Sequence, residues 1–278
     1  MNATKTVEFV RKPVLNVMAL LSLLGNTSTT AITGVEDSRT GSIGVVPSLR
    51  INSGAAGAVS PAEATVVAYF SKDSSDKQGQ TAVTLMLEGL PAALAGDVNA
   101  MVCGWFLNNT HGSAQYAWQR QGSPHLPSAS QLSELREAME IPMLPLFPRP
   151  LSASHNGTAV LHGLPLSLPG VVALHACARP VTAPRAVSNL RVHVTTTKSP
   201  PEVVVYWSEP TDARCILTYV VSFAATAQGP FHRVNEANTI FTAYIHAQPL
   251  ASKATGCYQV TVVDYWQRSS SPTAPVCL

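Results

Sequence analysis

Proline and glycine divide this 278-residue chain into short segments, because 21 prolines and 17 glycines fall between runs rich in Val, Leu, Tyr and Thr. Runs of this kind between turn-forming residues are typical of β-strands. The chain is also longer than a typical single domain. The pattern predicts a mainly β protein with strands at 64–70, 81–87, 98–107, 159–168 and 171–178, and in a second group at 189–195, 202–207, 217–223, 239–246 and 258–264.

One apolar segment near the start of the chain departs from this pattern. Residues 13–24 are predicted to form a helix, with Pro13 in the first turn, where a missing N–H group costs nothing, and Gly25 as the stop. Apolar side chains cover almost its whole circumference, so we expect the helix to be buried on several sides against a larger body. It is too short to span a bilayer, and no membrane span is predicted.

A second helix is predicted within the first group of strands. Residues 131–139 follow a capping box in which Ser128 and Gln131 satisfy each other's backbone N–H groups. The proline-rich stretch 142–150 is predicted to be a semi-rigid connector, and residues 179–184 to be a linker between two domains. The predicted fold is therefore a β-sandwich with a helical insertion, followed by a separate β-domain.

Composition excludes several classes of protein. Charged residues make up 12% of the chain, about half the usual share, while 46% of residues are apolar, so the chain is a folded protein. A net charge of +2 without a long basic run excludes an electrostatic footprint for nucleic acid. The five cysteines have neither CxxC spacing nor histidines at zinc-finger distances, so we expect no metal site. No cofactor is predicted.

Motifs that carry catalysis are missing from the sequence. It contains no GxSxG, HExxH, P-loop or GxGxxG pattern. Glu134, Glu137 and Glu140 share one face of the second predicted helix, which is the spacing of an acid/base pair. A solvated helix face is the favoured interpretation, because apolar residues occupy the opposite side.

Two other sets of side chains could contribute to a site. A hydrolytic site could be assembled from His155, His162 and His175 with Ser152 and Ser154, but only by choosing freely among residues expected at the surface. Four aromatic residues could stack on a sugar ring, although aromatic residues in strands are more often core. These are Tyr69, Trp105, Tyr116 and Trp118.

The last third of the chain has the pattern of an immunoglobulin-like sandwich. Trp207 ends an alternating run in an early strand, and Tyr258 opens an alternating late strand. A buried Trp in an early strand and a tyrosine corner near a late strand are typical of fibronectin type III and Ig-like domains. The segment Asp264–Trp266 follows the last clear strand, where we expect Trp266 to pack against a neighbouring domain.

Five separated stretches resemble one enzyme family in the same order along the chain. They are Val10–Leu15, Val83–Leu85, Val172–Pro180, Cys215–Tyr219 and Tyr258–Trp266. On these residues the chain resembles the α-L-iduronidases, lysosomal members of glycoside hydrolase family 39. In that family a (β/α)₈ barrel is followed by a β-sandwich and a type-III-like domain. The resemblance implies that residues 1–30 are a barrel remnant ending in its final helix, residues 31–180 the β-sandwich, and residues 181–278 the fibronectin type III-like domain.

The resemblance also implies a reaction. The family hydrolyses terminal α-L-iduronic acid from dermatan and heparan sulfate, with retention through a glycosyl-enzyme intermediate. Its catalytic Glu pair sits on barrel strands that this chain does not contain, and no Glu here matches either residue. We therefore expect no catalytic residue in this chain, no activity from the chain alone, the missing barrel as its partner, glycosaminoglycan as substrate only in the full-length enzyme, and a lysosomal location.

Two covalent features follow from the resemblance. Cys177 and Cys215 match family cysteines that pair, and such a link closes a loop of about 38 residues and stabilises by about 4 kcal/mol at most. Cys103, Cys257 and Cys277 depart from the family pattern. Glycosylation is expected at four sequons, of which only the first matches the family: Asn2, Asn26, Asn108 and Asn156.

Two non-enzymatic alternatives remain open at this stage. One is a secreted β-sandwich and type III module that binds carbohydrate or protein. The other is a structural fragment without a ligand, which the low net charge favours over glycosaminoglycan capture. Under the family interpretation, Val14, Leu15, Met18 and Leu21 face a barrel, so we expect the helix 13–24 to be mobile or to drive aggregation when the chain is alone.

Overall fold

The computed structural model describes residues 10–31, 42–50, 62–71, 79–154, 156–195, 201–210, 214–247 and 254–278. It is mainly β, as the sequence predicts. Backbone contacts divide the described chain into two compact units, Val10–Val181 and Thr182–Leu278. Each unit has its own apolar core. Among the described residues, no helix has both the length and the apolar character needed to cross a membrane.

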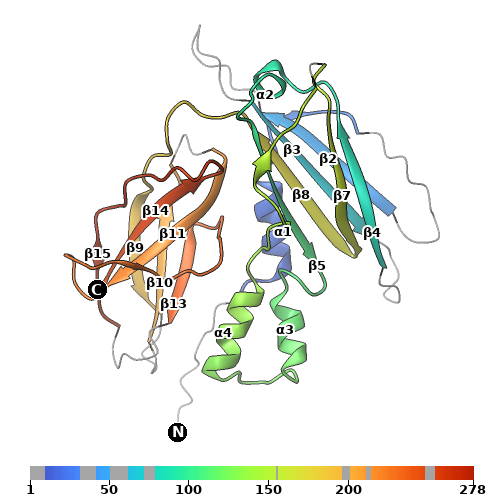
Figure 1. Cartoon of the computed structure of the whole chain (residues 1–278). Helices are drawn as coiled ribbons and strands as arrows, with labels where there is room; N and C mark the ends of the chain where they lie inside the picture. The colour runs from blue at the N-terminus through green and yellow to red at the C-terminus, as the bar shows by residue number, and fades with distance from the viewer. Residues whose placement is uncertain are drawn as a thin grey trace. The chain divides into compact units, whose positions relative to one another are not determined.

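Strands of the first unit form two sheets (Figure 1). Within the described residues, the larger sheet has the order β1-β2-β3-β8-β5-β6, and every neighbouring pair is antiparallel. The smaller sheet pairs β4 with β7. The bounds are β1 Thr27–Ser28, β2 Ser42–Arg50, β3 Glu63–Ser71, β4 Gly79–Leu87, β5 Met101–Asn108, β6 Arg149–Pro150, β7 Ala159–Leu168 and β8 Gly170–Cys177.

One core lies between these two sheets. Alternate residues of β3, β8 and β5 point toward it, together with apolar residues of β7 and β4. The alternation follows from the two-residue period of a strand. All five strands predicted for this unit are present within a few residues of their predicted bounds, whereas β2 was not predicted as a separate strand.

The first helix, α1, spans Pro13–Leu21, with Pro13 at the first-turn position as predicted. It ends three residues earlier than predicted, and the chain continues in tight turns in which Leu23 N–H donates to the carbonyl of Leu20. The helix is less buried than expected. Within it only Asn16 and Leu20 are buried, so much of its apolar surface faces outward.

The described part of the first unit contains three further helices: α2 Ala92–Ala95, α3 Ala114–Arg120 and α4 Ala129–Ala138. The predicted capping box at the start of α4 is present, with Ser128 and Gln131 each bonded to the other's backbone N–H group. The sequence predicted α4 but not α3. The two helices pack together as a helical hairpin that follows β5 (Figure 1).

The second unit consists of two facing sheets. Within the described residues, one has the order β13-β10-β9 and the other β12-β11-β14-β15. Trp207 of β10 and Tyr219 of β11 meet edge to face across the core, with ring centroids 5.3 Å apart. The bounds are β9 Ser188–Val194, β10 Glu202–Ser208, β11 Ile216–Ala224, β12 His232–Arg233, β13 Ala243–Ala247, β14 Cys257–Asp264 and β15 Val276–Cys277.

Trp207 is buried in an early strand, as predicted, and Tyr258 is fully buried in the late strand β14. A tyrosine corner bonds its hydroxyl to the backbone. The Tyr258 hydroxyl lies 2.9 Å from Nδ1 of His246, a side chain of β13 in the other sheet.

Candidate functional site

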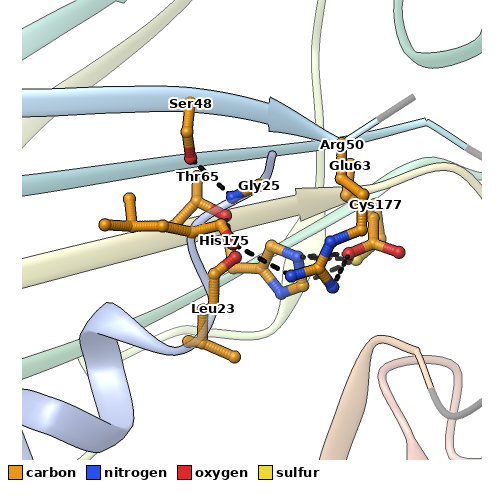
Figure 2. Close-up of polar contacts among 9 residues, drawn as sticks. Leu23, Gly25, Ser48, Arg50, Glu63, Thr65, His175 and Cys177 are labelled. Carbon is orange, nitrogen blue, oxygen red and sulfur yellow. Dashed lines mark hydrogen bonds and ion pairs between the residues drawn. The ribbon is translucent and has the colours of Figure 1, made fainter. Parts of the chain in front are cut away.

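Polar side chains gather at one end of the larger sheet, on the face opposite the core. The strand register sets Arg50, Glu63 and Cys177 side by side across β2, β3 and β8. Two residues away on each strand, Ser48, Thr65 and His175 form the next row. Because side chains two residues apart in a strand share a face, both rows point the same way (Figure 2).

A buried carboxylate is the centre of this cluster. Oε2 of Glu63 lies 3.2 Å from Nη1 of Arg50 and 3.3 Å from Nε2 of His175. The Glu63 and His175 side chains are 2% and 4% exposed. An ionised carboxylate removed from water needs opposite charge and hydrogen bonds to remain stable. Arg50, a third exposed, supplies the permanent charge.

The same rows hold the segment that follows α1. Nη2 of Arg50 donates to the carbonyl of Leu24 at 2.9 Å, and the Thr65 hydroxyl donates to the carbonyl of Leu23 at 2.7 Å. The N–H group of Gly25 donates to the Ser48 hydroxyl at 2.8 Å. Figure 2 shows these contacts as dashed lines between the strands and the segment that follows α1. The cluster therefore fastens the end of α1 to the sheet.

Gly25 is the residue that permits this close approach. A Cβ atom there would lie 2.1 Å from the backbone oxygen of Leu49. A side chain at this position would push the segment away from β2 and break the bond to Ser48. The glycine that the sequence indicated as a helix stop thus also allows the chain to cross a strand at contact distance.

This arrangement differs from that of a glycosidase. A retaining glycosidase places two carboxyl groups about 5 Å apart. Glu63 instead contacts two basic side chains through one oxygen atom. Within the described residues, no group of three or more His, Cys, Asp and Glu side chains could hold a metal ion. The geometry of the cluster suits a structural joint.

The three carboxylates proposed from helical spacing have separate environments. Glu134 and Glu137 are exposed on α4, which agrees with the solvated-face interpretation. Glu140 lies beyond the end of α4 and forms an ion pair with Arg11, with Oε1 and Nη2 2.7 Å apart. Glu140 therefore links two elements and does not belong to a solvated face.

The histidine and serine candidates are not brought together as one set. His175 is buried, which corrects the expectation of a surface residue. His162 is exposed on β7 with Nδ1 3.4 Å from the Thr84 hydroxyl, and Ser154 lies in the turn before that strand. Ser152 is exposed, and His155 lies outside the described residues.

Burial separates the four aromatic candidates. Trp105 is 2% exposed, as the core interpretation predicts. Tyr69, Tyr116 and Trp118 are 40%, 36% and 37% exposed. The Tyr69 ring packs over Gly44, and the Trp118 Nε1–H group donates to the carbonyl of Pro124 at 3.0 Å.

The cysteines fall into different classes. Cys257 and Cys277 form a disulfide between the neighbouring strands β14 and β15, a pair that sequence analysis did not predict. Cys103 is a free and buried thiol, and burial raises its pKa far above the usual range. Cys177 and Cys215 are both buried. In the first unit, Sγ of Cys177 lies 3.6 Å from Nε2 of His175.

The sequons also differ. Asn26 and Asn156 are exposed. Asn108 is half-buried, and its Oδ1 accepts from the backbone N–H groups of Thr110 and His111 at 2.9 and 2.8 Å. Asn2 lies outside the described residues. Glycosylation of the four stays a prediction.

The chain is similar to known proteins along almost its whole length. Residues 1–157 match the family model described as glycosyl hydrolases family 39, and residues 190–277 match that of the α-L-iduronidase C-terminal domain. Mouse α-L-iduronidase is 32% identical over 97% of this chain and 41% of the mouse protein. The human enzyme is 31% identical over 97% of this chain and 40% of the human protein. This chain therefore spans about two fifths of the length of these relatives.

A solved structure agrees with this similarity. The bacterial orthologue of human α-L-iduronidase superposes with a TM-score of 0.76 over 98% of this chain and 43% of that chain, at 22% identity. At this identity the match establishes the fold. Together with the family model that covers more than half of the sequence, these similarities show that the chain belongs to glycosyl hydrolase family 39.

Proposed function

We propose that this chain is the C-terminal portion of an α-L-iduronidase, the enzyme that removes terminal α-L-iduronic acid from dermatan and heparan sulfate. The observation that carries the proposal is the similarity to mouse α-L-iduronidase, which covers 97% of this chain but 41% of the relative. Because residues 190–277 also match the α-L-iduronidase C-terminal domain, we infer that the chain supplies the domains that follow the catalytic barrel. It works with that barrel and acts on glycosaminoglycan only as part of the longer enzyme, in the lysosome.

In this proposal the chain alone is inactive. Retaining hydrolysis needs a carboxylic acid and a carboxylate on opposite sides of the scissile bond. Among the described residues of the first unit, the most buried carboxylate is that of Glu63, which contacts Arg50 and His175. Three further carboxylates were proposed from helical spacing. Glu134 and Glu137 are exposed, and Glu140 forms an ion pair with Arg11. None of these environments supports an acid/base and nucleophile pair.

The proposed domain identities fit the observed geometry. In α1, the side chains of Val14, Leu15 and Met18 are 55%, 51% and 59% exposed, which supports a final barrel helix whose apolar face meets the barrel. The three-stranded and four-stranded sheets of the second unit, packed around Trp207, support a fibronectin type III-like domain.

We also propose that Cys177 and Cys215 form a disulfide. With Cys103 free and Cys257 paired to Cys277, these two buried cysteines complete the set of five. Non-reducing peptide mapping tests the pairing. A peptide that joins residues around 177 to residues around 215 is expected, and free alkylation of both thiols in the unfolded, unreduced chain would refute the proposal.

An activity assay tests the proposed function. The purified 278-residue chain is incubated with a fluorogenic α-L-iduronide at acidic pH, with mouse α-L-iduronidase as the positive control. We expect no turnover above the buffer blank. Turnover by the chain that is lost with a heat-unfolded sample would overturn the proposed inactivity.

The alternative is a non-enzymatic secreted module that binds carbohydrate or protein. The three partly exposed aromatic side chains, Tyr69, Tyr116 and Trp118, are the observation in its favour. Calorimetric titration with heparan and dermatan sulfate oligosaccharides separates the two proposals. Saturable binding without cleavage favours the module, and no binding favours the incomplete enzyme.

A further inference from the structure

The helical hairpin of α3 and α4 has no role in the function proposed above, yet it contacts α1 through several polar groups. Asn16 is fully buried in α1, although the helix is otherwise mainly apolar. Its Nδ2 group donates to the carbonyl of Gly112, before α3, at 2.9 Å and to the carbonyl of Met139, after α4, at 2.8 Å. One amide group of α1 thus bonds to both ends of the hairpin.

Arg11 adds a second attachment at the same place. Its Nη2 group lies 2.7 Å from Oε1 of Glu140 and 3.3 Å from the carbonyl of Met139. The Arg11 and Glu140 side chains are 17% and 16% exposed, so water screens this pair less than it screens a surface pair. Asn16 and Arg11 meet at the same carbonyl oxygen.

Helix physics explains why that oxygen is a good anchor. Met139 is the C-terminal cap of α4. The last carbonyl groups of a helix lack partners within the helix, and its C-terminal end carries a partial negative charge that attracts cations. Asn16 and Arg11 supply the missing donors and the positive charge from another element. The Met139 carbonyl at the end of α4 therefore accepts hydrogen bonds from Asn16 of α1 and from Arg11 just before α1.

Backbone geometry at the other anchor is equally specific. Gly112 has a φ of +67°, and a Cβ atom there would lie 2.2 Å from Leu107 and 3.5 Å from Nδ2 of Asn16. Glycine is the residue that adopts this conformation without strain. Its carbonyl is therefore held in place by the turn that leads from β5 into α3.

We propose that the α3–α4 hairpin is a clamp that keeps α1 folded and seated on the β-sandwich in this chain by itself. The clamp consists of Arg11, Asn16, Gly112, Met139 and Glu140. It replaces the expectation from sequence that this helix is mobile in the chain alone. It also keeps the exposed residues Val14, Leu15 and Met18 presented outward as a preformed docking face.

The identity of the docking partner rests on the proposed function, in which it is the catalytic barrel of the same enzyme. A preformed face lowers the ordering cost when the two parts assemble. The clamp itself does not rest on that function, because it concerns contacts within residues 10–181. Failure of the clamp test would leave the iduronidase assignment intact, and turnover in the activity assay would leave the clamp intact.

Hydrogen exchange of the 278-residue chain tests the clamp. In the wild type, amides of α1 are expected to exchange at least roughly a hundredfold more slowly than in an unstructured peptide. Asn16→Asp keeps the size of the side chain but replaces the Nδ2 group, which donates to the carbonyls of Gly112 and Met139, with an oxygen atom that can only accept. We expect it to speed exchange in α1 by about tenfold or more, with β8 unchanged. The matched control, Met18→Gln, changes an exposed residue of the same helix and should leave exchange in α1 unaltered.

Glu140→Gln decides the question if Asn16→Asp fails to fold. It removes one charge of the ion pair and keeps the shape, so a smaller increase in exchange of about threefold, confined to α1, is expected. Exchange in wild-type α1 at the rate of an unstructured peptide would overturn the proposal. So would an increase in Glu140→Gln that is equal in α1 and β8, or no increase in α1 in either variant.

Discussion

Two histidines, one in each unit, are shielded from water in different ways: His175 is buried and His246 is partly buried. His175 lies on β8 of the first unit beside the carboxylate of Glu63, which also binds Arg50. His246 lies in the second unit between aromatic rings, 5.3 Å from Phe223 and 5.7 Å from Tyr258 by ring centroids. Burial and the nearby charge of His232 lower the pKa of His246 to about 4.

The surroundings of these two histidines represent two ways to remove polar groups from water. The first unit pairs the Glu63 carboxylate with the Arg50 guanidinium beside His175, and the resulting cluster fastens the segment after α1. The second unit surrounds a neutral imidazole with rings and adds one hydrogen bond to a phenol. The first solution fails when one charge is removed, and the second fails when the imidazole gains a proton. Three experiments test this contrast, and a fourth tests the disulfide that closes the second unit.

Glu63→Ala is expected to have the largest effect. The substitution removes the buried carboxylate that contacts both Arg50, a third exposed, and the buried His175, so the free energy of unfolding of the first unit should fall by about 3 kcal/mol. Hydrogen exchange of β8 under native conditions measures the loss. Glu88→Ala, at an exposed position, is the control and should change stability by no more than about 0.5 kcal/mol. Equal effects of the two substitutions would contradict a charge-based cluster.

Loss of the Cys257–Cys277 disulfide should destabilise the second unit by about 3 kcal/mol, because a link across 20 residues restricts the unfolded chain. The double substitution Cys257→Ala and Cys277→Ala tests this through exchange of β14. Cys103→Ala removes the free thiol of the first unit and should leave β14 unchanged. If β14 is equally protected in both variants, packing rather than the disulfide holds this edge of the unit.

Acid should weaken the second unit through His246. The pKa of this group is about 4 in the folded state against an ordinary 6.5, so between these values the unfolded chain binds more protons. The stabilisation that depends on a neutral His246 is fully present above pH 6.5 and is lost as the pH falls toward 4. Allowing for the partial exposure of His246, the loss is about 1 to 2 kcal/mol. The loss is measured by urea unfolding at pH 7.5 and 4.5, with hydrogen exchange of the β14 amides as the probe.

His246→Phe is the matched variant for the pH experiment, because it keeps a ring of similar size without a titrating group. Between pH 7.5 and 4.5, the unfolding free energy of this variant should fall by about 1 to 2 kcal/mol less than that of the wild type. An unchanged slope would assign the acid sensitivity of this unit to other residues.

Tyr258→Phe should have the smallest effect. It removes the hydroxyl that lies 2.9 Å from Nδ1 of His246 and leaves the ring contacts in place. A loss of about 1 kcal/mol in the unfolding free energy of the second unit is expected at pH 7.5. The melting temperature provides the measurement, and Tyr206→Phe, at an exposed position of β10, is the control. Equal shifts in the two variants would remove the hydrogen bond from the comparison.

Local patterns in the sequence were sufficient for many elements. The strand 159–168 has the predicted bounds, and the capping box of Ser128 and Gln131 forms as expected. Both signals lie within a few neighbouring residues. The strand β2 was missed because Gly44 and Pro47 interrupt it, and both residues weaken a strand prediction. Gly44 is tolerated there because the Tyr69 ring of β3 covers it.

The joints between elements could not be predicted in this way. Glu63 and His175 are 112 residues apart in sequence, and Asn16 and Met139 are 123 apart. Neither pair has a local signal. From the sequence alone, His175 is expected at the surface, and Asn16 is one polar residue in an apolar helix. Their partners are identified only by the fold.

The sequence by itself determined a mainly β chain, its strand groups, the capped helix α4 and the resemblance to family 39, because these depend on residue order over short distances and on similarity along the chain. Only the tertiary structure decided that Glu63 lies between Arg50 and His175, and that Asn16 caps the end of α4. The physical reason is that buried polar groups must find partners wherever the fold brings them, and strand register and helix docking set those positions.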